Sequence, residues 1–250
     1  MIGVVARHEG LRLLRSVQTW IIAALLTALF GFLFLKQLES FIDLQAQLAA
    51  QDHPVGLSGF MSIRYLEPLA LVFTVLAPLF AMRSFSDEYR HQTFALWQSS
   101  PVSSTALVIG KFLGIFSVLI LLIFTAVTML MVMQIFVNID IKLLLTATLG
   151  LCLCAAGSTA CGLYFSALTR QNLIAIIASL ALLLLSWMLG SANFSNMPLQ
   201  FLADLSIANH LRGFFQGYVK VRDIAFFALM IFLFLGLGII KLDSIRQTGN

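Results

Sequence analysis

The chain of 250 residues is 60% hydrophobic and only 10% charged, whereas soluble globular domains are roughly 45–50% apolar and about 25% charged, so a water-soluble fold could not bury its apolar surface. The apolar residues come in long blocks, and since about 20 helical residues cross a bilayer core of about 30 Å, the blocks predict a polytopic membrane protein. The net charge of +4 comes from basic residues scattered between the blocks, which favours membrane lipids as partners and excludes a nucleic-acid partner.

Residues 1–18 precede the first apolar block. Their apolar side chains, Ile2, Ala6, Leu13 and Val17, share one helical face, and His8, Arg12 and Arg15 share another. This pattern predicts an interfacial helix in the plane of the lipid headgroups, with a simple basic flank as the alternative. The block that follows is longer than the apolar region of a signal peptide, so we interpret it as a retained anchor.

Uncharged apolar blocks predict an all-α membrane protein with six transmembrane helices, at about residues 19–35, 66–82, 112–137, 143–168, 173–189 and 224–240. Both termini then lie on one side, and the segments on that side carry more Lys and Arg than those on the other. By the positive-inside rule this predicts an N-in/C-in topology, in the inner (cytoplasmic) membrane of the cell. The second span is expected to extend its uncharged block, which begins at Leu69, by a few residues, so that Glu67 lies near one interface. No charged residue lies within the uncharged blocks themselves, which argues against an ion-coupled carrier.

The loop between the second and third spans has the pattern of a short amphipathic helix, which we place at residues 84–99. Ser84 is predicted to cap it, with Asp87 three residues later. After Ser99-Ser100-Pro101, either Ser103 or Ser104 can cap the third span. An ordinary linker on the bilayer surface is the alternative interpretation.

Small residues are concentrated in the fourth span, where Gly150, Cys154, Gly157 and Cys161 follow one another at spacings of three or four. Such residues let helix backbones approach closely, so we expect this span to pack against other helices. The three cysteines of the chain all lie in this apolar segment, which predicts neither a disulfide framework nor a metal site.

Residues 190–223 are too numerous for a turn and too apolar for a solvated loop. Irregular backbone at membrane depth must be buried in protein or line a cavity. We therefore expect a segment outside the cytoplasm that is partly re-entrant, with Phe201 and Phe214 shielded and Asn193 accessible. A lid packed on the helix ends is the alternative.

The sequence contains no recognisable catalytic constellation. Gly110-Lys111 is followed by Phe112 and preceded by Thr105 at the position where a phosphate-binding loop needs its first glycine. His8-Glu9 lacks the second histidine of a zinc helix, and no serine sits in a nucleophile elbow. We expect no enzyme activity, no cofactor and no metal in this chain.

The stretch LAPLFAMRSFSDEYRHQTFALWQSSPVSSTALVIGKFLG resembles the signature of ABC-2-type permeases. The matching residues are Pro78, Glu88, Thr93, Leu96, Ser100, Pro101, Gly110 and Lys111, and Gln92 replaces a glycine of the pattern. A second stretch, LSIANHLRGFFQGYVKVRDIAFFALM, is similar to the gliding-motility GldF-like and nitrous-oxide-cluster NosY-like branch of that family.

The resemblance implies a half-transporter, a homodimer or a heterodimer with a second permease, whose separate cytoplasmic ATPase subunits bind ATP and Mg. Residues 84–99 would be the coupling helix that docks on the ATPase, and Glu88 matches the acidic position of the family. The expected ATPase-coupling residues are Phe85, Asp87, Glu88, Tyr89, Arg90, Thr93, Leu96 and Trp97. The function implied is transport, in the direction of export. The alternative is a non-transporting scaffold that couples ATP hydrolysis to envelope, gliding or pilus machinery.

Overall fold

The computed structural model describes residues 1–48, 56–90, 102–135, 137, 140–191 and 204–248. Six helices in these ranges are long and apolar enough to cross a membrane, which confirms the predicted all-α fold with six spans. The elements are α1 (Ile2–Leu14), α2 (Val17–Leu48), α3 (Leu57–Met61), the π-helix η2 (Ser62–Leu66), α4 (Glu67–Ala81), α5 (Arg83–Arg90), α7 (Ser104–Met133), α8 (Ile141–Leu168), α9 (Asn172–Ser191), α11 (Ile207–Phe215) and α12 (Val221–Thr248).

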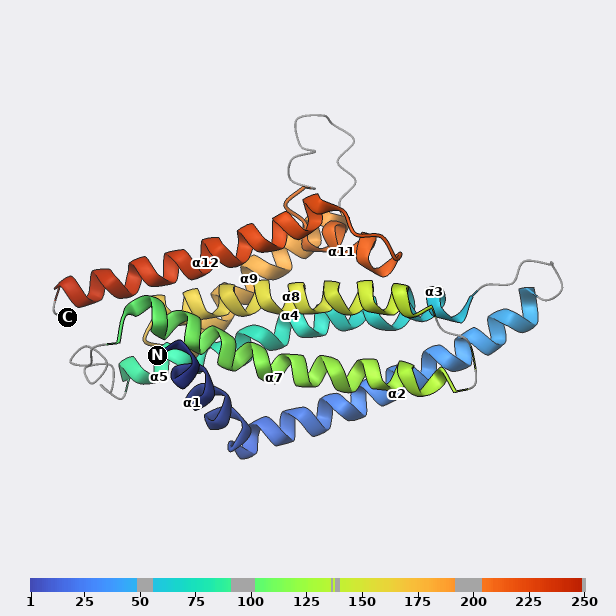
Figure 1. Ribbon diagram of the computed structural model, residues 1–250, viewed down its shortest axis with the longest axis horizontal. Helices are drawn as coiled ribbons and strands as arrows, with labels where there is room; N and C mark the ends of the chain where they lie inside the picture. Colours follow the sequence, from blue (N-terminus) through green and yellow to red (C-terminus); the bar gives the residue numbers. More distant parts are fainter. Residues whose placement is uncertain (49–55, 91–101, 136, 138–139, 192–203, 249–250) are drawn as a thin grey trace.

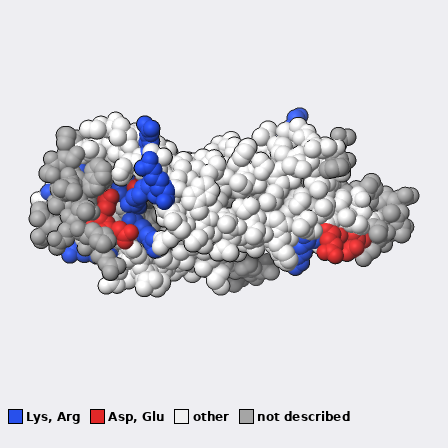
Figure 2. All heavy atoms as spheres, turned by 90° about the horizontal axis from the view of Figure 1, so that it is seen from below, with Lys and Arg blue, Asp and Glu red and all other residues white. Residues whose placement is uncertain are grey.

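The long helices run along the longest axis of the molecule, and both chain termini lie near the same end (Figure 1). We call this the terminal end, and the opposite end, where α3 and α11 lie, the distal end. Charged side chains gather toward both ends of the face drawn in Figure 2, and the region between them is uncharged. This distribution is the one expected of a protein whose middle lies in hydrocarbon.

The spans extend beyond the apolar blocks because polar caps set where they begin. The Ser103 hydroxyl accepts a hydrogen bond from Ala106 N at 3.2 Å, so the predicted cap of the third span is confirmed at Ser103. Asp140 caps α8 by accepting from Lys142 N at 3.0 Å and Leu143 N at 3.4 Å. Lys111, which directly precedes the apolar block at 112–137, consequently lies inside α7.

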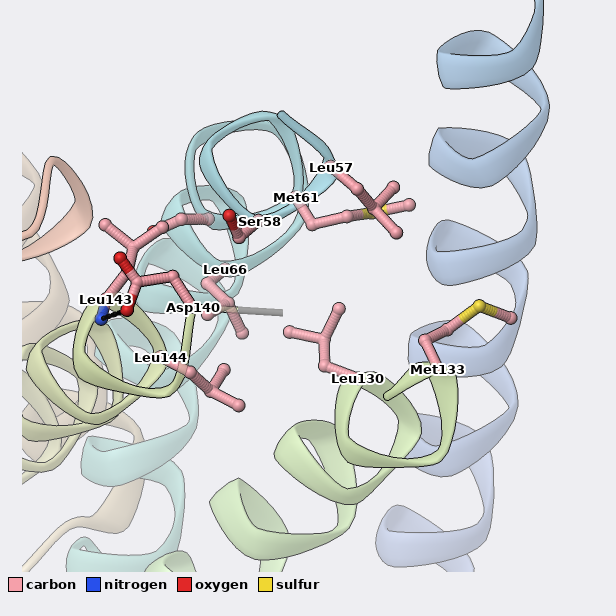
Figure 3. Close-up of a pocket in the computed structure, with 10 residues that line it drawn as sticks. Leu57, Ser58, Met61, Leu66, Leu130, Met133, Asp140, Leu143 and Leu144 are labelled. Atoms are coloured by element: carbon pink, nitrogen blue, oxygen red, sulfur yellow. Dashed lines mark hydrogen bonds between the residues drawn. The ribbon is translucent and has the colours of Figure 1, made fainter. Parts of the chain in front are cut away.

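The second span contains a π-helical turn. Pro68 has no N–H to donate to the carbonyl of Arg64, so the regular bonding of an α-helix is interrupted there. The chain instead widens over Ser62–Leu66, and Glu67 N bonds Ser62 O. A small cavity of about 10 Å³ lies beside this turn (Figure 3). It is lined by residues of α3, η2, α7 and α8 and by Asp140. It has room for no more than about one water molecule, so it is not a substrate site.

α8 contacts α4, α7, α9, α11 and α12, and it lies between them (Figure 1). The structure places the four predicted packing residues on it: Gly150 faces Phe214, Gly157 faces Met230, Cys154 Sγ lies 3.2 Å from Thr74 Oγ1, and Cys161 is buried. Gly162 lies against Pro78 of α4. These small residues leave room for neighbouring helices to approach closely.

A leucine in place of Gly162 is expected to prevent correct assembly. A Cβ at Gly162 would lie 2.8 Å from Pro78 Cα, which is backbone and cannot move aside, whereas a Cβ at Gly157 would lie 3.0 Å from the flexible Met230 Sδ. Overpacking costs about 1–3 kcal/mol or more, so we expect Gly157→Leu also to disrupt assembly. Its effect should be smaller than that of Gly162→Leu, because the Met230 side chain can move aside. Size-exclusion chromatography in detergent tests this, with Gly236→Leu, where nothing lies within 4 Å, as the control. Equal profiles for all three variants would refute the close approach.

The segment before the last span folds back onto the spans at the distal end. α11 begins after the cap Ser206 and buries Leu211, Phe214 and Phe215 against its neighbours, which include α8 and α9. Ser62 of η2 donates to Phe215 O at 2.7 Å. Phe214 is thus shielded as expected, while Phe201 and Asn193 lie outside the described residues.

Candidate functional site

α5 follows α4 after the single residue Met82 and lies at the terminal end (Figure 1). It covers the first half of the helix expected at residues 84–99. Thr93, Leu96 and Trp97 lie outside the described residues, as does the side chain of Arg90. Three consecutive residues of α5, Ser84, Phe85 and Ser86, are buried, so one side of this helix faces the membrane-spanning part of the protein.

A serine of α8 caps α5 from outside. The first N–H groups of a helix have no acceptor within it. Ser166 Oγ accepts from Phe85 N at 3.1 Å and from Ser86 N at 3.2 Å, and it donates to Met82 O at 2.8 Å. The Ser86 hydroxyl lies 2.9 Å from Thr169 O and donates to it. The prediction that Ser84 caps this helix is wrong, because α5 already begins at Arg83.

Replacing Ser166 with alanine should destabilise the terminal end by roughly 1–3 kcal/mol, because two buried N–H groups would lose their acceptor. The measurement is thermal unfolding of the purified chain in detergent. Ser179→Ala is a matched control, since the buried Ser179 hydroxyl bonds only backbone carbonyls of its own helix at 2.7 and 3.0 Å. If Ser166→Ala and Ser179→Ala unfold at the same temperature, the cap does not contribute to the stability of the terminal end.

Lys111 of α7 makes an ion pair with Glu88 of α5. Its Nζ lies 2.5 Å from Glu88 Oε1 and 2.5 Å from Ser84 O, and 4.7 Å above the centre of the Phe85 ring. The side chain of Lys111 is 2% exposed and that of Glu88 is 11% exposed. A charge at this depth is tolerated only when it is paired and hydrogen-bonded, so the pair holds α5 against α7.

α1 crosses α7 at two glycines. A Cβ at Gly110 would lie 2.6 Å from Val5 Cβ, and a Cβ at Gly114 would lie 2.7 Å from Glu9 Cβ. The residues that α1 buries are Val5, Glu9 and Gly10, none of which belongs to the apolar set expected from the sequence. α1 also ends at Leu14, and the following residues from Val17 belong to α2, so the helix is shorter than the expected 1–18.

The buried carboxylate of Glu9 connects α1 to α5. It is 3% exposed and accepts from the Ser84 hydroxyl at 3.1 Å and from the Arg12 guanidinium at 2.7 Å. On the other side of α5, Asn172 Nδ2 of α9 donates to Asp87 Oδ1 at 2.7 Å. Polar contacts therefore join α5 to α1, α7, α8 and α9.

Residues 4–244 match the family described as ABC-2 family transporter protein. The chain belongs to the ABC-2 transporter family. No curated protein matches the chain. Together with the six spans, membership makes this a multi-pass membrane protein and a permease of the ABC transporter type, whose relatives generally work with a separate ATP-binding cassette ATPase.

Two of the residues expected to contact an ATPase face the interior of this ABC-2 permease. Phe85 is buried under the Lys111 ammonium group, and Glu88 is bonded to Lys111, so both hold α5 in place and are not surface anchors. Asp87 and Tyr89 are partly exposed, and Arg83 is exposed.

Sequence reasoning missed the partners Glu9, Ser166 and Asn172. It found Glu88 and Gly110-Lys111 as separate parts of one family pattern. Because Glu88 and Lys111 both belong to that pattern, the sequence could have suggested that the two residues interact.

A second buried polar cluster lies at the distal end of the permease. His210 Nδ1 lies 2.7 Å from Asp223 Oδ1, its Nε2 lies 2.8 Å from Asp204 O, and the ring stacks on Phe226 at 4.1 Å between ring centres. These contacts fix α11 to the beginning of α12. Within the described parts of the chain, no three His, Cys, Asp or Glu side chains come together in a way that could hold a metal ion.

Proposed function

We propose that this chain is the membrane-spanning subunit of an ABC-2-type exporter, and that α5 with the residues after it receives force from a separate cytoplasmic ATPase that binds ATP and Mg. The observation that supports this best is the number of elements to which α5 is bonded. Within eight residues α5 is connected to α1, α7, α8 and α9. A displacement of α5 would therefore act on three spans and on the N-terminal helix at once.

Two parts of the segment that begins with α5 have different roles in this proposal. Phe85, Glu88 and the buried serines attach it to the spans, and Asp87 adds a bond to α9. Tyr89, together with Arg90, Thr93, Leu96 and Trp97 that follow, supplies the contact with the ATPase. Large aromatic residues and arginine are the types that dominate the energetics of protein interfaces.

The terminal end is the cytoplasmic end in this topology. The basic residues at this end support that orientation by the positive-inside rule, and the membrane is then the inner (cytoplasmic) membrane. α1 lies at the depth of the headgroups, and α11 lies outside the cytoplasm. Two permeases, identical or different, pair to form the transport path.

Site-specific photocross-linking tests the docking proposal. A photoreactive residue at Arg83 or Tyr89 should cross-link to the ATPase in the assembled complex, and one at Tyr218, exposed at the distal end, should not. Cross-links to the ATPase from Tyr218, or from none of the α5 positions, would contradict the proposal. In the same complex, Glu88→Ala should leave the permease inserted while uncoupling ATP hydrolysis from function.

The alternative is a non-transporting scaffold that uses ATP hydrolysis to act on envelope, gliding or pilus machinery. It is supported by the resemblance of Leu205–Met230 to the GldF-like and NosY-like branch. In a scaffold, the distal end would hold another envelope protein permanently. A photoreactive Tyr218 that cross-links to a stoichiometric envelope protein would favour this function, whereas transport predicts no such stable partner there.

A further inference from the structure

α2 lies close to the second span toward the distal end and leaves it toward the terminal end. Aromatic ring pairs join the two, with 5.8 Å between the centres of Phe30 and Phe73, 5.7 Å between those of Phe34 and Tyr65, and 5.4 Å between those of Phe41 and Phe60. Toward the terminal end a groove of about 520 Å³ opens between α1 and α2 on one side and α4 and α5 on the other. Ligand sites in proteins typically measure about 300–1,000 Å³.

The groove has an apolar part and a polar part. Ile21 and Ile22 of α2 and Leu79 and Phe80 of α4 form the apolar part. The polar part is formed by Arg12, Ser16, Gln18, Thr19, Arg83 and Asp87. Arg83 donates to the Gln18 amide oxygen and so spans the groove from α5 to α2.

The depth of the groove in the bilayer is marked by Trp20. Its side chain is 62% exposed, and its indole N–H donates to Leu14 O at 2.7 Å. Exposed tryptophans with a polar handle are enriched where hydrocarbon meets the headgroups. The arginines, which come from α1 and α5, therefore lie at headgroup level, and the apolar part of the groove lies in the hydrocarbon.

We propose that this groove binds one anionic glycerophospholipid, with its phosphate between Arg12 and Arg83 and an acyl chain along Ile21, Leu79 and Phe80. Arg12, Arg83 and Asp87 are the charged residues that line the groove, and the Asp87 carboxylate already accepts from Asn172. The Glu9 carboxylate, which pairs with Arg12, is 3% exposed and does not line the groove, so the surface offered to a ligand favours an anion. Arg12 is held in place by its bond to Glu9. The groove combines an apolar part with a polar part that contains two arginines, which fits an amphiphile. A free phosphate ion would contact only the polar part.

The position of the site gives the lipid a role in the packing of the terminal end. α1 and α5 approach each other through the Ser84–Glu9 bond on one side of the groove. A phosphate between Arg12 and Arg83 adds a second link between the same two helices. The lipid thereby bridges the N-terminal helix and α5 independently of what the protein transports.

Fluorescence of Trp20 tests the proposal in the full-length chain. In the variant Trp97→Phe/Trp187→Phe, Trp20 is the single tryptophan, and the protein is placed in phosphatidylcholine vesicles that contain either brominated phosphatidylglycerol or brominated phosphatidylcholine. We expect the anionic lipid to quench at a severalfold lower mole fraction. Arg83→Gln should lower this preference about fivefold, because a cation near the surface contributes ~1 kcal/mol per anionic contact.

Arg7→Gln is the matched control, because Arg7 is exposed on the same helix α1 and does not line the groove. Equal quenching by both brominated lipids, no quenching by either because protein covers the groove, or an equal loss in both arginine variants would overturn the proposal. So would relief of quenching by inorganic phosphate, which would indicate a site for the free ion. If the tryptophan variant fails to fold, native mass spectrometry of the otherwise unchanged chain should show one retained phosphatidylglycerol in the wild-type and Arg7→Gln proteins and less in Arg83→Gln.

Discussion

Lys111→Met is expected to destabilise the protein by about 3–5 kcal/mol, because it leaves the Glu88 carboxylate buried without its cation. The ammonium group of Lys111 also donates to Ser84 O, so the variant removes a second bond between α7 and α5. The midpoint of thermal unfolding in detergent should fall sharply, and ATP hydrolysis in the assembled complex should lose its coupling to the permease.

Two further variants separate the ion pair from other effects. Lys142→Met changes an exposed lysine and should leave the midpoint unchanged. In the double variant Lys111→Met/Glu88→Leu both charges are gone, and most of the lost stability should return, since apolar replacement of a buried pair is often neutral. Coupling should stay lost in the double variant. If Lys111→Met alone unfolds at the wild-type midpoint, the pair does not hold α5.

Gly114→Leu is expected to detach α1 from α7. A Cβ at Gly114 would lie 2.8 Å from Ala6 O and 3.0 Å from Gly10 N, so the backbone of α1 itself stands in the way. Overpacking of about 1–3 kcal/mol shifts a docking equilibrium by about one to two orders of magnitude. A cysteine at Val5, which is 7% exposed in the docked helix, reports the change through its reaction with a water-soluble maleimide.

The labelling rate of the Val5→Cys protein should rise at least about tenfold when Gly114→Leu is added. Gly3→Leu is the control on the same helix, because nothing lies within 4 Å of a Cβ there. Slow labelling in both backgrounds would mean that α1 tolerates the side chain and that the glycine is not needed for its docking.

The number and kind of spans could be predicted from the sequence because the thickness of the bilayer imposes a minimum length on every apolar helix. The ends of the helices could not, since they depend on single capping residues and on polar turns beyond the apolar blocks. Ser103 was found by its position before the third span. Asp140 was not, although it caps α8 in the same way.

The sequence predicted a helix between the second and third spans, and α5 covers the first half of the expected range. The sequence did not predict what each side of this helix contacts. Amphipathicity indicates which residues share a face, but it does not say whether that face meets water, lipid or protein. Phe85 looks like an anchor for a partner, yet it lies beneath Lys111, a residue of another helix. Glu9 and Ser166 could not be found, because isolated polar residues gain a role only when folding brings α1 and α8 beside α5.

The central position of α8 also bears on how the protein enters the membrane. The two most enclosed spans, Leu57–Tyr89 and Ile141–Leu168, have mean hydropathies of 1.8 and 1.7, below the 2.1 to 2.8 of the other four. They therefore gain less free energy from partition into lipid, and more of their stability comes from helix contacts made after insertion. Biogenesis and folding are coupled for these two segments. A more hydrophobic α8 would insert more readily, but its larger side chains would occupy the spaces that Phe214 and Pro78 need.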